Sequence, residues 1–253
     1  MSEHSVPKSP HSEASTPLTA RTGVRLSEIS APETDRRRQI GLLVFDGVEE
    51  LDVVGPWEVL SNWTRTHPED GWDVFCMSVD GGPVVGVKSL MLGAHHSTES
   101  APRLDVLIHP GGSGTRPMLN DPEHLQWVRE ARREVPLMAS VCTGSLVYAA
   151  AGLLTGRRAT THWASLNHLA ELDPTVITDV RARFVDDGDL ITSAGVSAGI
   201  DMSLHLVARL AGTDRAQEVR RDIQYDPMPP VATSHDDATR PSRRPASETR
   251  TTT

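Results

Sequence analysis

One cysteine in this chain stands where an apolar strand turns into a helix. Cys142 lies in the segment PLMASVCTGSLVYAAAGLL, between an apolar run that ends at Val141 and a helical pattern that begins near Ser145. Its small neighbours permit the tight, strained turn that lifts a nucleophile out of a sheet. The N-terminus of the following helix also favours a thiolate over a thiol. The pattern predicts a nucleophile elbow with Cys142 as the nucleophile.

A free cysteine has a second interpretation, because such a residue is often a small buried hydrophobe. Cys76 fits it, since it lies inside an apolar strand, and we expect it in the core. Cys142 differs because a glycine-rich segment, HPGGSGT, follows a neighbouring strand, and open α/β folds bind ligands at such strand ends. Neither the two cysteines nor the tandem His95-His96 shows metal-ligand spacing, so we predict no metal.

The elements that must position these residues alternate along the chain. Short apolar runs alternate with amphipathic stretches, which is typical of a parallel sheet covered by helices on both faces. We therefore predict an α/β fold, a flavodoxin-like parallel sheet sandwiched by helices. Hairpins are expected over 83–94 and 181–193, the second turning at Asp187-Gly188. Strands are predicted at 39–45, 72–79, 104–109, 135–141 and 158–161, and helices from near Gly55-Pro56, after Asp121, from Ser145, over 163–172 and over 197–210.

Both ends of the chain differ in composition from its middle. Residues 1–38 and 229–253 are poor in large apolar side chains, so we expect disordered tails around one domain at 39–228. The formal net charge of −9 lies almost wholly on that domain, which disfavours nucleic acid as a partner. We interpret the Arg36-Arg37-Arg38 run as a solvated linker end. Because no membrane span or secretory signal is present, we expect a cytoplasmic protein with no membrane partner.

Several segments together resemble the ThiJ/PfpI (class I glutamine amidotransferase-like) superfamily. They are GLLVFDGVEELDVVGPWEVL, HPGGSGT, SVCTGS, ATTHW and TSAGVSAGID, and they extend over about residues 40–227. The residues of these motifs are most similar to those of the isonitrile hydratase group and of the sensor domains of AraC-type regulators. The resemblance implies that Cys142 is the nucleophile and that Asp52 is the acid beside it that handles protons. It also implies that Thr143 lines the same pocket.

The resemblance gives roles to further positions. Gly111 and Gly112 match backbone amides near the oxyanion-hole position, with the Thr143 amide as a second donor. His162 matches a histidine that other branches carry near the sulfur, although in a Thr-Thr-His-Trp turn it is at least as typical of a helix start or a dimer interface. Candidates for the wall of the substrate pocket or of a dimer, or for ordinary core, are Trp57, Trp163 and Val196.

The implied function is that of an isonitrile hydratase, which adds water to an isocyanide and gives an N-substituted formamide without a cofactor. Thr143 rather than histidine follows the nucleophile and no downstream His-x-Glu is present, which disfavours the protease-like and amidotransferase branches. Two alternatives stay open. One is a non-catalytic small-molecule sensor related to AraC-type regulators; the other is glyoxalase or deglycase activity, against which an aspartate at position 52 argues modestly. The resemblance also implies a small-molecule substrate and a homodimer.

Overall fold

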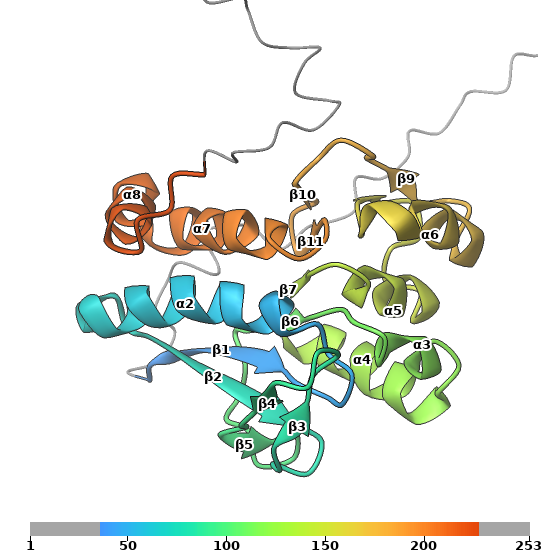
Figure 1. Cartoon of the computed structure of the whole chain (residues 1–253), viewed down its shortest axis with the longest axis horizontal. Helices are drawn as coiled ribbons and strands as arrows, with labels where there is room; N and C mark the ends of the chain where they lie inside the picture. The colour runs from blue at the N-terminus through green and yellow to red at the C-terminus, as the bar shows by residue number, and fades with distance from the viewer. Residues whose placement is uncertain (1–35, 228–253) are drawn as a thin grey trace, which may run out of the picture.

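A seven-stranded sheet forms the centre of the molecule (Figure 1). The structure, a computed structural model, describes residues 36–227. The strands of this sheet are β1 Arg38–Leu43, β2 Trp72–Ser78, β5 His96–Ser97, β6 Val106–His109, β7 Leu137–Ser140, β10 Phe184–Asp186 and β11 Leu190–Ser193. They are ordered β10-β11-β7-β6-β1-β2-β5, and every neighbouring pair is parallel except β10 and β11.

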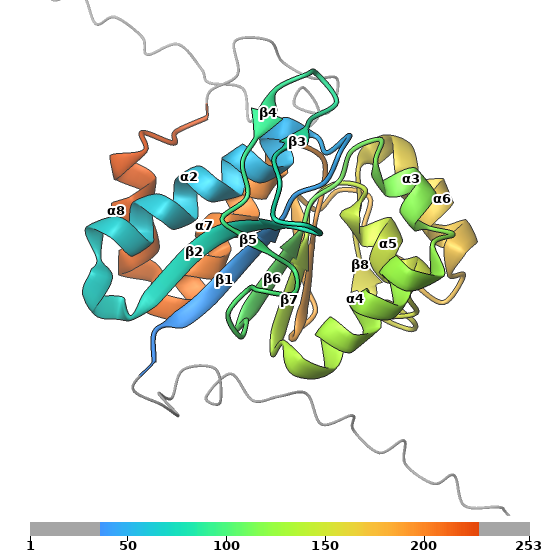
Figure 2. The same cartoon turned by 90° about the horizontal axis from the view of Figure 1, so that it is seen from below.

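Helices cover both faces of this sheet. They are α2 Glu50–Thr66, α3 Thr115–Met118, α4 Pro122–Glu134, α5 Gly144–Ala150, α6 Leu166–Leu172, α7 Ala198–Ala211 and α8 Thr213–Asp222. Figure 2 shows α2, α7 and α8 on one side and α3, α4, α5 and α6 on the other. Because both faces are covered, every residue of β6 and β7 is buried. The predicted flavodoxin-like α/β fold is confirmed, with an antiparallel strand, β10, at one edge.

The strand order changes direction between β1 and β6. From β1 the chain continues to β2 on one side, whereas β6, β7 and β11 follow one another on the other side. At such a switch point the connections leave in opposite directions and open a crevice at the carboxyl ends of the strands. The segments that follow these strands carry Asp52, Gly111, Cys142 and Val196. The topology therefore places all four residues at the carboxyl ends of neighbouring strands.

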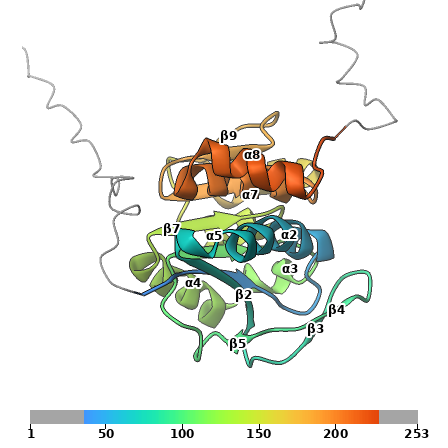
Figure 3. The same cartoon turned by 90° about the vertical axis from the view of Figure 1, so that its left-hand side faces the viewer.

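Both predicted hairpins are present. β10 and β11 pair antiparallel on either side of Asp187-Gly188, and so do β3 Val84–Val85 and β4 Met91–Leu92. The β3–β4 hairpin projects from the body of the molecule (Figure 3). Its turn is tied to the start of α2, since the Lys88 amide donates to Glu50 Oε1 at 2.5 Å. A separate short parallel pair joins β8 Arg158–Ala159 to β9 Ile177–Thr178.

Helix α2 begins at Glu50, earlier than the predicted start near Gly55-Pro56. That prediction rested on the preference of proline for the first turn of a helix. In the structure Pro56 lies inside the helix, where it leaves the carbonyl of Asp52 without the usual amide donor. Acidic residues occupy the first turn instead and interact favourably with the helix dipole. The earlier start is what places Asp52 on the helix at all.

Helix α8 was not predicted, because its sequence TDRAQEVRRD is almost entirely polar. Tertiary contacts hold it. Arg215 donates from Nε to Asp70 Oδ2 at 2.7 Å, and the same oxygen accepts from Trp63 Nε1 at 2.7 Å. Ala216 and Val219 of this helix are buried in the core. Two apolar side chains and one shared carboxylate thus help to hold a helix that hydropathy alone does not indicate.

The start of the domain also differs from the prediction. Arg36 pairs with Asp105 at 2.7 Å and Arg37 with Asp73 at 2.9 Å, so these arginines are not a free solvated linker. They fasten the chain to the amino ends of the strands before β1 begins at Arg38. The predictions for residues 1–35 and 228–253 lie outside the described residues. Within 36–227 no helix is long and apolar enough to cross a bilayer.

Gly144 provides a test of how tightly α5 packs against the end of β6. A Cβ at Gly144 would lie 2.2 Å from the carbonyl oxygen of His109, which belongs to the sheet and has no room to move. We expect Gly144→Ala to lower the free energy of unfolding by about 2 kcal/mol. Gly93→Ala is the matched control, because a Cβ at Gly93 would have nothing within 4 Å. Urea unfolding of both variants checks this, and equal midpoints would contradict it.

Candidate active site

Cys142 lies on a strained turn between β7 and α5. Its φ of +56° is in the left-handed region, which costs a non-glycine residue roughly 1–3 kcal/mol. Its amide donates to the carbonyls of Ser193 and Ala194, both at 3.2 Å. Its carbonyl accepts from the hydroxyls of Ser145 at 3.1 Å and Thr161 at 2.9 Å. No role was predicted for either hydroxyl, although Ser145 and Thr161 both belong to the segments that carry the family resemblance.

Asp52 reaches the same point from the first turn of α2. Its side chain has no solvent exposure, and Oδ2 accepts a hydrogen bond from the Gly111 amide at 2.9 Å. The other oxygen, Oδ1, is buried without a conventional hydrogen-bond partner. The Cys142 thiol and the Val196 amide interact with this carboxyl group. A buried carboxyl oxygen without a hydrogen-bond partner carries a desolvation cost, so its presence here calls for an explanation.

The backbone of Gly111 joins helix α2 to the elbow at Cys142. Its carbonyl accepts from the Glu49 amide at 2.9 Å while its own amide donates to Asp52. A Cβ at Gly111 would lie 2.5 Å from the Thr143 nitrogen, so only glycine permits this approach. The next amide, that of Gly112, donates to Thr143 Oγ1 at 3.0 Å. Both amides that the resemblance assigned to an oxyanion hole therefore have protein acceptors in this structure.

The electrostatics of the pair follow mainly from burial. Burial raises the pKa of Asp52 to about 7, against the opposing effect of the Gly111 hydrogen bond, and the charge of Glu49 adds to the rise. Burial and then the charge of Asp52 raise the pKa of Cys142 to about 12. The pKa of Cys142 is therefore raised, whereas the N-terminus of α5 alone was expected to lower it. The site therefore holds a thiol beside a carboxyl that changes its charge near neutral pH.

Val196 contributes its backbone to this pair. It lies between β11 and α7 with a φ of +54°, a second left-handed residue and one with a branched side chain. Its amide lowers the pKa of both Asp52 and Cys142, although burial outweighs it at each. The Thr143 amide acts on the sulfur in the same sense. The two amides favour negative charge on the sulfur. The oxyanion-hole role that the resemblance implies for the Thr143 amide is a different one and stays a prediction.

His162 is placed as a helix-start residue. Its Nδ1 accepts from the Ala164 amide at 3.3 Å, which caps the turn before α6. No hydrogen bond joins it to Cys142 or Asp52 within the described residues. Trp163 beside it is 77% exposed and is therefore not a core residue. Trp57 stacks on His95 with ring centroids 5.3 Å apart.

Cys76 is buried in the core cluster, as predicted, and burial raises its pKa to about 12. Both cysteines are free thiols. In the part of the chain that the structure describes, no group of three histidine, cysteine, aspartate or glutamate side chains is arranged to hold a metal ion.

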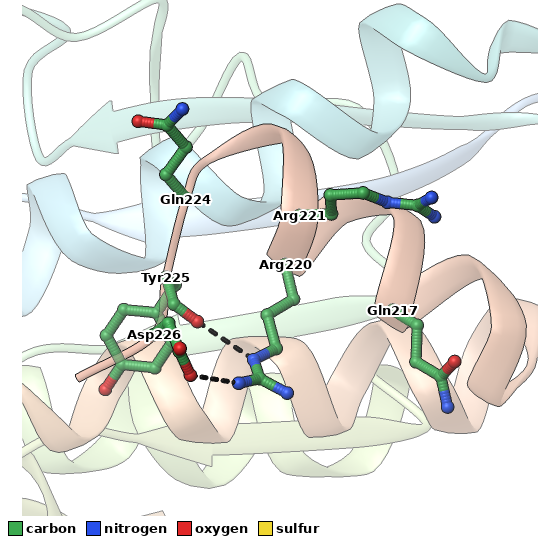
Figure 4. Close-up of a pocket in the computed structure, with 6 residues that line it drawn as sticks. All are labelled: Gln217, Arg220, Arg221, Gln224, Tyr225 and Asp226. Carbon is green, nitrogen blue, oxygen red and sulfur yellow. Dashed lines mark hydrogen bonds and ion pairs between the residues drawn. The ribbon is translucent and has the colours of Figure 1, made fainter. Parts of the chain in front are cut away.

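A surface hollow of about 600 Å³ lies at the end of α8 (Figure 4). The residues that line it are of polar and charged types, and Arg220 already donates to the Tyr225 carbonyl at 2.9 Å and to Asp226 at 2.6 Å. No residue of the Cys142 site lines it. The arrangement suited to covalent chemistry is the Cys142–Asp52 pair, and this hollow is separate from it.

Residues 38–209 match the family model described as the DJ-1/PfpI family. The chain belongs to the DJ-1/PfpI family. The resemblance drawn from the motifs is thereby confirmed. Among structures of this family, the crystal structure of a ThiJ/PfpI family protein from Pseudomonas syringae superposes with a TM-score of 0.70 at 32% identity, covering 84% of this chain and 85% of that one.

Two relatives represent the two functional classes that the motifs suggested. The isonitrile hydratase of Pseudomonas putida is 41% identical over 192 residues, which cover 76% of this chain and 80% of that enzyme. The HTH-type transcriptional regulator CdhR of Pseudomonas aeruginosa is 33% identical over 178 residues, which cover 70% of this chain and 52% of the regulator. This DJ-1/PfpI chain therefore matches most of the hydratase but about half of the regulator.

The burial of Asp52 predicts a pH-dependent cost in stability. Because its folded pKa is raised to about 7, its contribution to stability is fully present below the ordinary carboxyl pKa and is lost as the pH rises through about 7. Asp52→Asn carries no charge. We expect its stability relative to the natural chain to increase between pH 4 and pH 8 by about 2 to 4 kcal/mol.

Chemical denaturation at the two pH values measures this difference. The control is Asp222→Asn, at an exposed position on α8, whose relative stability should not change with pH in this way. A gain for Asp52→Asn that is the same at both pH values would show that the charge of Asp52 is not the cause.

Proposed function

We propose that this DJ-1/PfpI protein is a cysteine-dependent hydratase that adds water to a small isocyanide and releases an N-substituted formamide. The observation that carries the proposal is the pairing of Cys142, on its strained elbow, with a buried Asp52 carboxyl that has one unbonded oxygen. The identity of 41% with an isonitrile hydratase supports the same reaction. The chemistry needs an activated nucleophile and a group that moves protons, and this pair supplies both.

In the first half of the reaction, the carboxylate of Asp52 takes the proton of the Cys142 thiol as sulfur attacks the terminal isocyanide carbon. A carbon–sulfur bond forms, and Asp52 then returns the proton to that carbon. The product is a thioimidate, R–N=CH–S–Cys. Because the pKa of Asp52 lies near 7, the same group serves as base and then as acid near neutral pH.

In the second half, Asp52 takes a proton from water as the oxygen adds to the thioimidate carbon, and passes that proton to the nitrogen, which gives R–NH–CH(OH)–S–Cys. Asp52 then takes the hydroxyl proton as the carbon–sulfur bond breaks and the carbonyl of the formamide forms, and it returns this proton to the sulfur. The amides of Thr143 and Val196 act on the sulfur whenever it carries negative charge. The net change is the addition of one water to the isocyanide.

Access to the sulfur also suits this substrate class. Cys142 is 6% exposed, so a substrate must present its reacting atom at the end of a slender group. An isocyanide does so, because its electrophilic carbon is the tip of a linear C–N unit. A narrow approach of this kind disfavours bulky acyl substrates, whose reacting carbon lies between two substituents.

Turnover of cyclohexyl isocyanide to its formamide tests the proposal. We expect Cys142→Ala and Asp52→Asn each to lower kcat by at least about 100-fold, since one removes the nucleophile and the other the proton carrier. Cys76→Ala is the matched control and should retain activity, because Cys76 lies in the core away from the elbow. Absence of turnover by the natural chain, with Cys142 still open to alkylation, would instead favour the sensor or aldehyde chemistry.

A sensor function is the second candidate, and the likeness to a transcriptional regulator favours it. In that function the same site would bind a small molecule without turnover. Calorimetric binding of an isocyanide with no formamide formed would support the sensor, whereas multiple turnovers would exclude it.

We further propose that two copies of this chain associate through an apolar surface beside the site. The β3–β4 hairpin exposes Val85, Val87, Leu90 and Met91, of which Met91 is 68% exposed. The adjoining start of α2 adds Leu51 and Val54. Exposed apolar side chains gathered on neighbouring elements in this way are typical of a protein interface.

Sedimentation velocity tests this surface. We expect the natural chain to sediment as a dimer and the double variant Leu90→Asp with Met91→Asp to sediment as a monomer, because two charges would be buried in the interface. Val180→Asp is the control, since Val180 is equally exposed but lies on another loop. A monomeric natural chain would exclude the association.

A further inference from the structure

A buried histidine lies directly behind the Gly111 peptide and has no role in the proposed reaction. His109 ends β6 and has no solvent exposure. Its ring makes two hydrogen bonds, one from Nδ1 to the Pro110 carbonyl at 2.8 Å and one between Nε2 and His124 Nε2 at 3.1 Å. Both ring nitrogens are therefore engaged, although nothing in the sequence marks this histidine as functional.

The partners of His109 decide its tautomer. The Pro110 carbonyl is an acceptor only, so Nδ1 must carry the hydrogen, and Nε2 of a neutral ring is then an acceptor. His124 on α4 consequently donates from its Nε2 to His109. Burial lowers the pKa of His109 to about 3, so the ring stays neutral and the tautomer does not change near neutral pH.

The Pro110 carbonyl and the Gly111 amide belong to the same planar peptide unit. His109 bonds one end of that unit, and the other end donates to Asp52 Oδ2 at 2.9 Å. A bond accepted at the carbonyl polarises the peptide and strengthens the donor at its nitrogen. It also fixes the rotation of the peptide plane, on which the direction of the Gly111 amide depends.

We propose that His109 is a positioning residue that orients and polarises the Pro110–Gly111 peptide, so that the Gly111 amide holds the Asp52 carboxyl toward Cys142. This inference rests on the proposed roles of Asp52 and Cys142. A chain of hydrogen bonds runs from His124 to His109, from His109 to the Pro110–Gly111 peptide, and from that peptide to Asp52. It links α4, on one side of the sheet, to the first turn of α2 on the other.

The remaining neighbours of His109 do not compete for its nitrogens. Tyr148 of α5 meets the ring edge-on, with centroids 5.8 Å apart, but donates its hydroxyl to the Ala139 carbonyl at 2.8 Å. Phe45 packs against the ring at a centroid distance of 5.6 Å and does not titrate. Asp121 is the charged group that acts on His124, whose pKa is lowered mainly by burial. The carbonyl of Pro110 is therefore the acceptor that determines the tautomer.

Matched variants separate the two ring nitrogens. His109→Asn places an amide donor at the position of Nδ1, whereas His109→Gln places its amide at the position of Nε2 and leaves the carbonyl without a donor. His109→Leu removes both ring nitrogens. If His109 acts through Nδ1, the asparagine variant keeps the influence of residue 109 on the pKa of Asp52, whereas the glutamine and leucine variants lose it.

The readout is the rate of Cys142 alkylation by iodoacetamide as a function of pH, followed by mass spectrometry of the Cys142 peptide. This rate should rise as Asp52 becomes a carboxylate and able to take the thiol proton, and Asp52→Asn should lack that inflection. We expect the midpoint to shift upward by roughly half a pH unit in His109→Leu and His109→Gln, because a weaker Gly111 donor stabilises the carboxylate less. His109→Asn should keep the natural midpoint.

A merely structural role would change the melting temperature of these variants without moving the midpoint. An unshifted midpoint in His109→Gln, or a shift in His109→Asn as large as in His109→Gln, would overturn the inference. The asparagine and glutamine variants carry this test even if His109→Leu does not fold. An inflection that persists in Asp52→Asn would overturn the proposed role of Asp52 itself, which distinguishes that failure from a failure of the role of His109.

Discussion

The site depends on two hydrogen bonds made by the backbone of Gly111. Its carbonyl accepts from the Glu49 amide, and its amide donates to Asp52. Because Gly111 has no Cβ, its backbone can also lie against Thr143 and Cys142. The helix that carries Asp52 and the elbow that carries Cys142 are thus joined through one residue. Any displacement of the glycine-rich loop moves both side chains, so the loop and the site behave as one unit.

The parallel sheet explains how residues that are distant in sequence meet here. The carboxyl ends of β1, β6, β7 and β11 lie side by side, and the chain leaves each of them into a turn. Two of these turns contain left-handed, non-glycine residues, Cys142 and Val196, whose strain is supported by the buried sheet beneath them. The strain aims a thiol and a backbone amide at the same carboxyl group, which regular strand or helix geometry would not do.

Burial accounts for both the electrostatics of the pair and its cost in stability. Removing Asp52 from water raises its pKa to about 7, which is the range that the proposed proton transfer requires near neutral pH. The same burial leaves one of its oxygens unbonded, a penalty that the surrounding core must offset. A site that is tuned by desolvation is consequently destabilising, and the apolar strands around it supply the compensating free energy.

The sequence by itself determined the fold class, the elbow at Cys142, the core role of Cys76 and both hairpins, because each depends on local composition and on periodicities of two or about four residues. It misplaced the start of α2 at Pro56 and did not indicate α8, since contacts with distant residues override helix signals there. Only the tertiary structure decided that Gly111 and Gly112 bond protein groups, that Val196 adds an amide to the pair, and that His109 lies behind Asp52. The hydrogen-bond partners of a backbone amide and the desolvation of a carboxyl group depend on which strand ends lie side by side, and no local pattern encodes that arrangement.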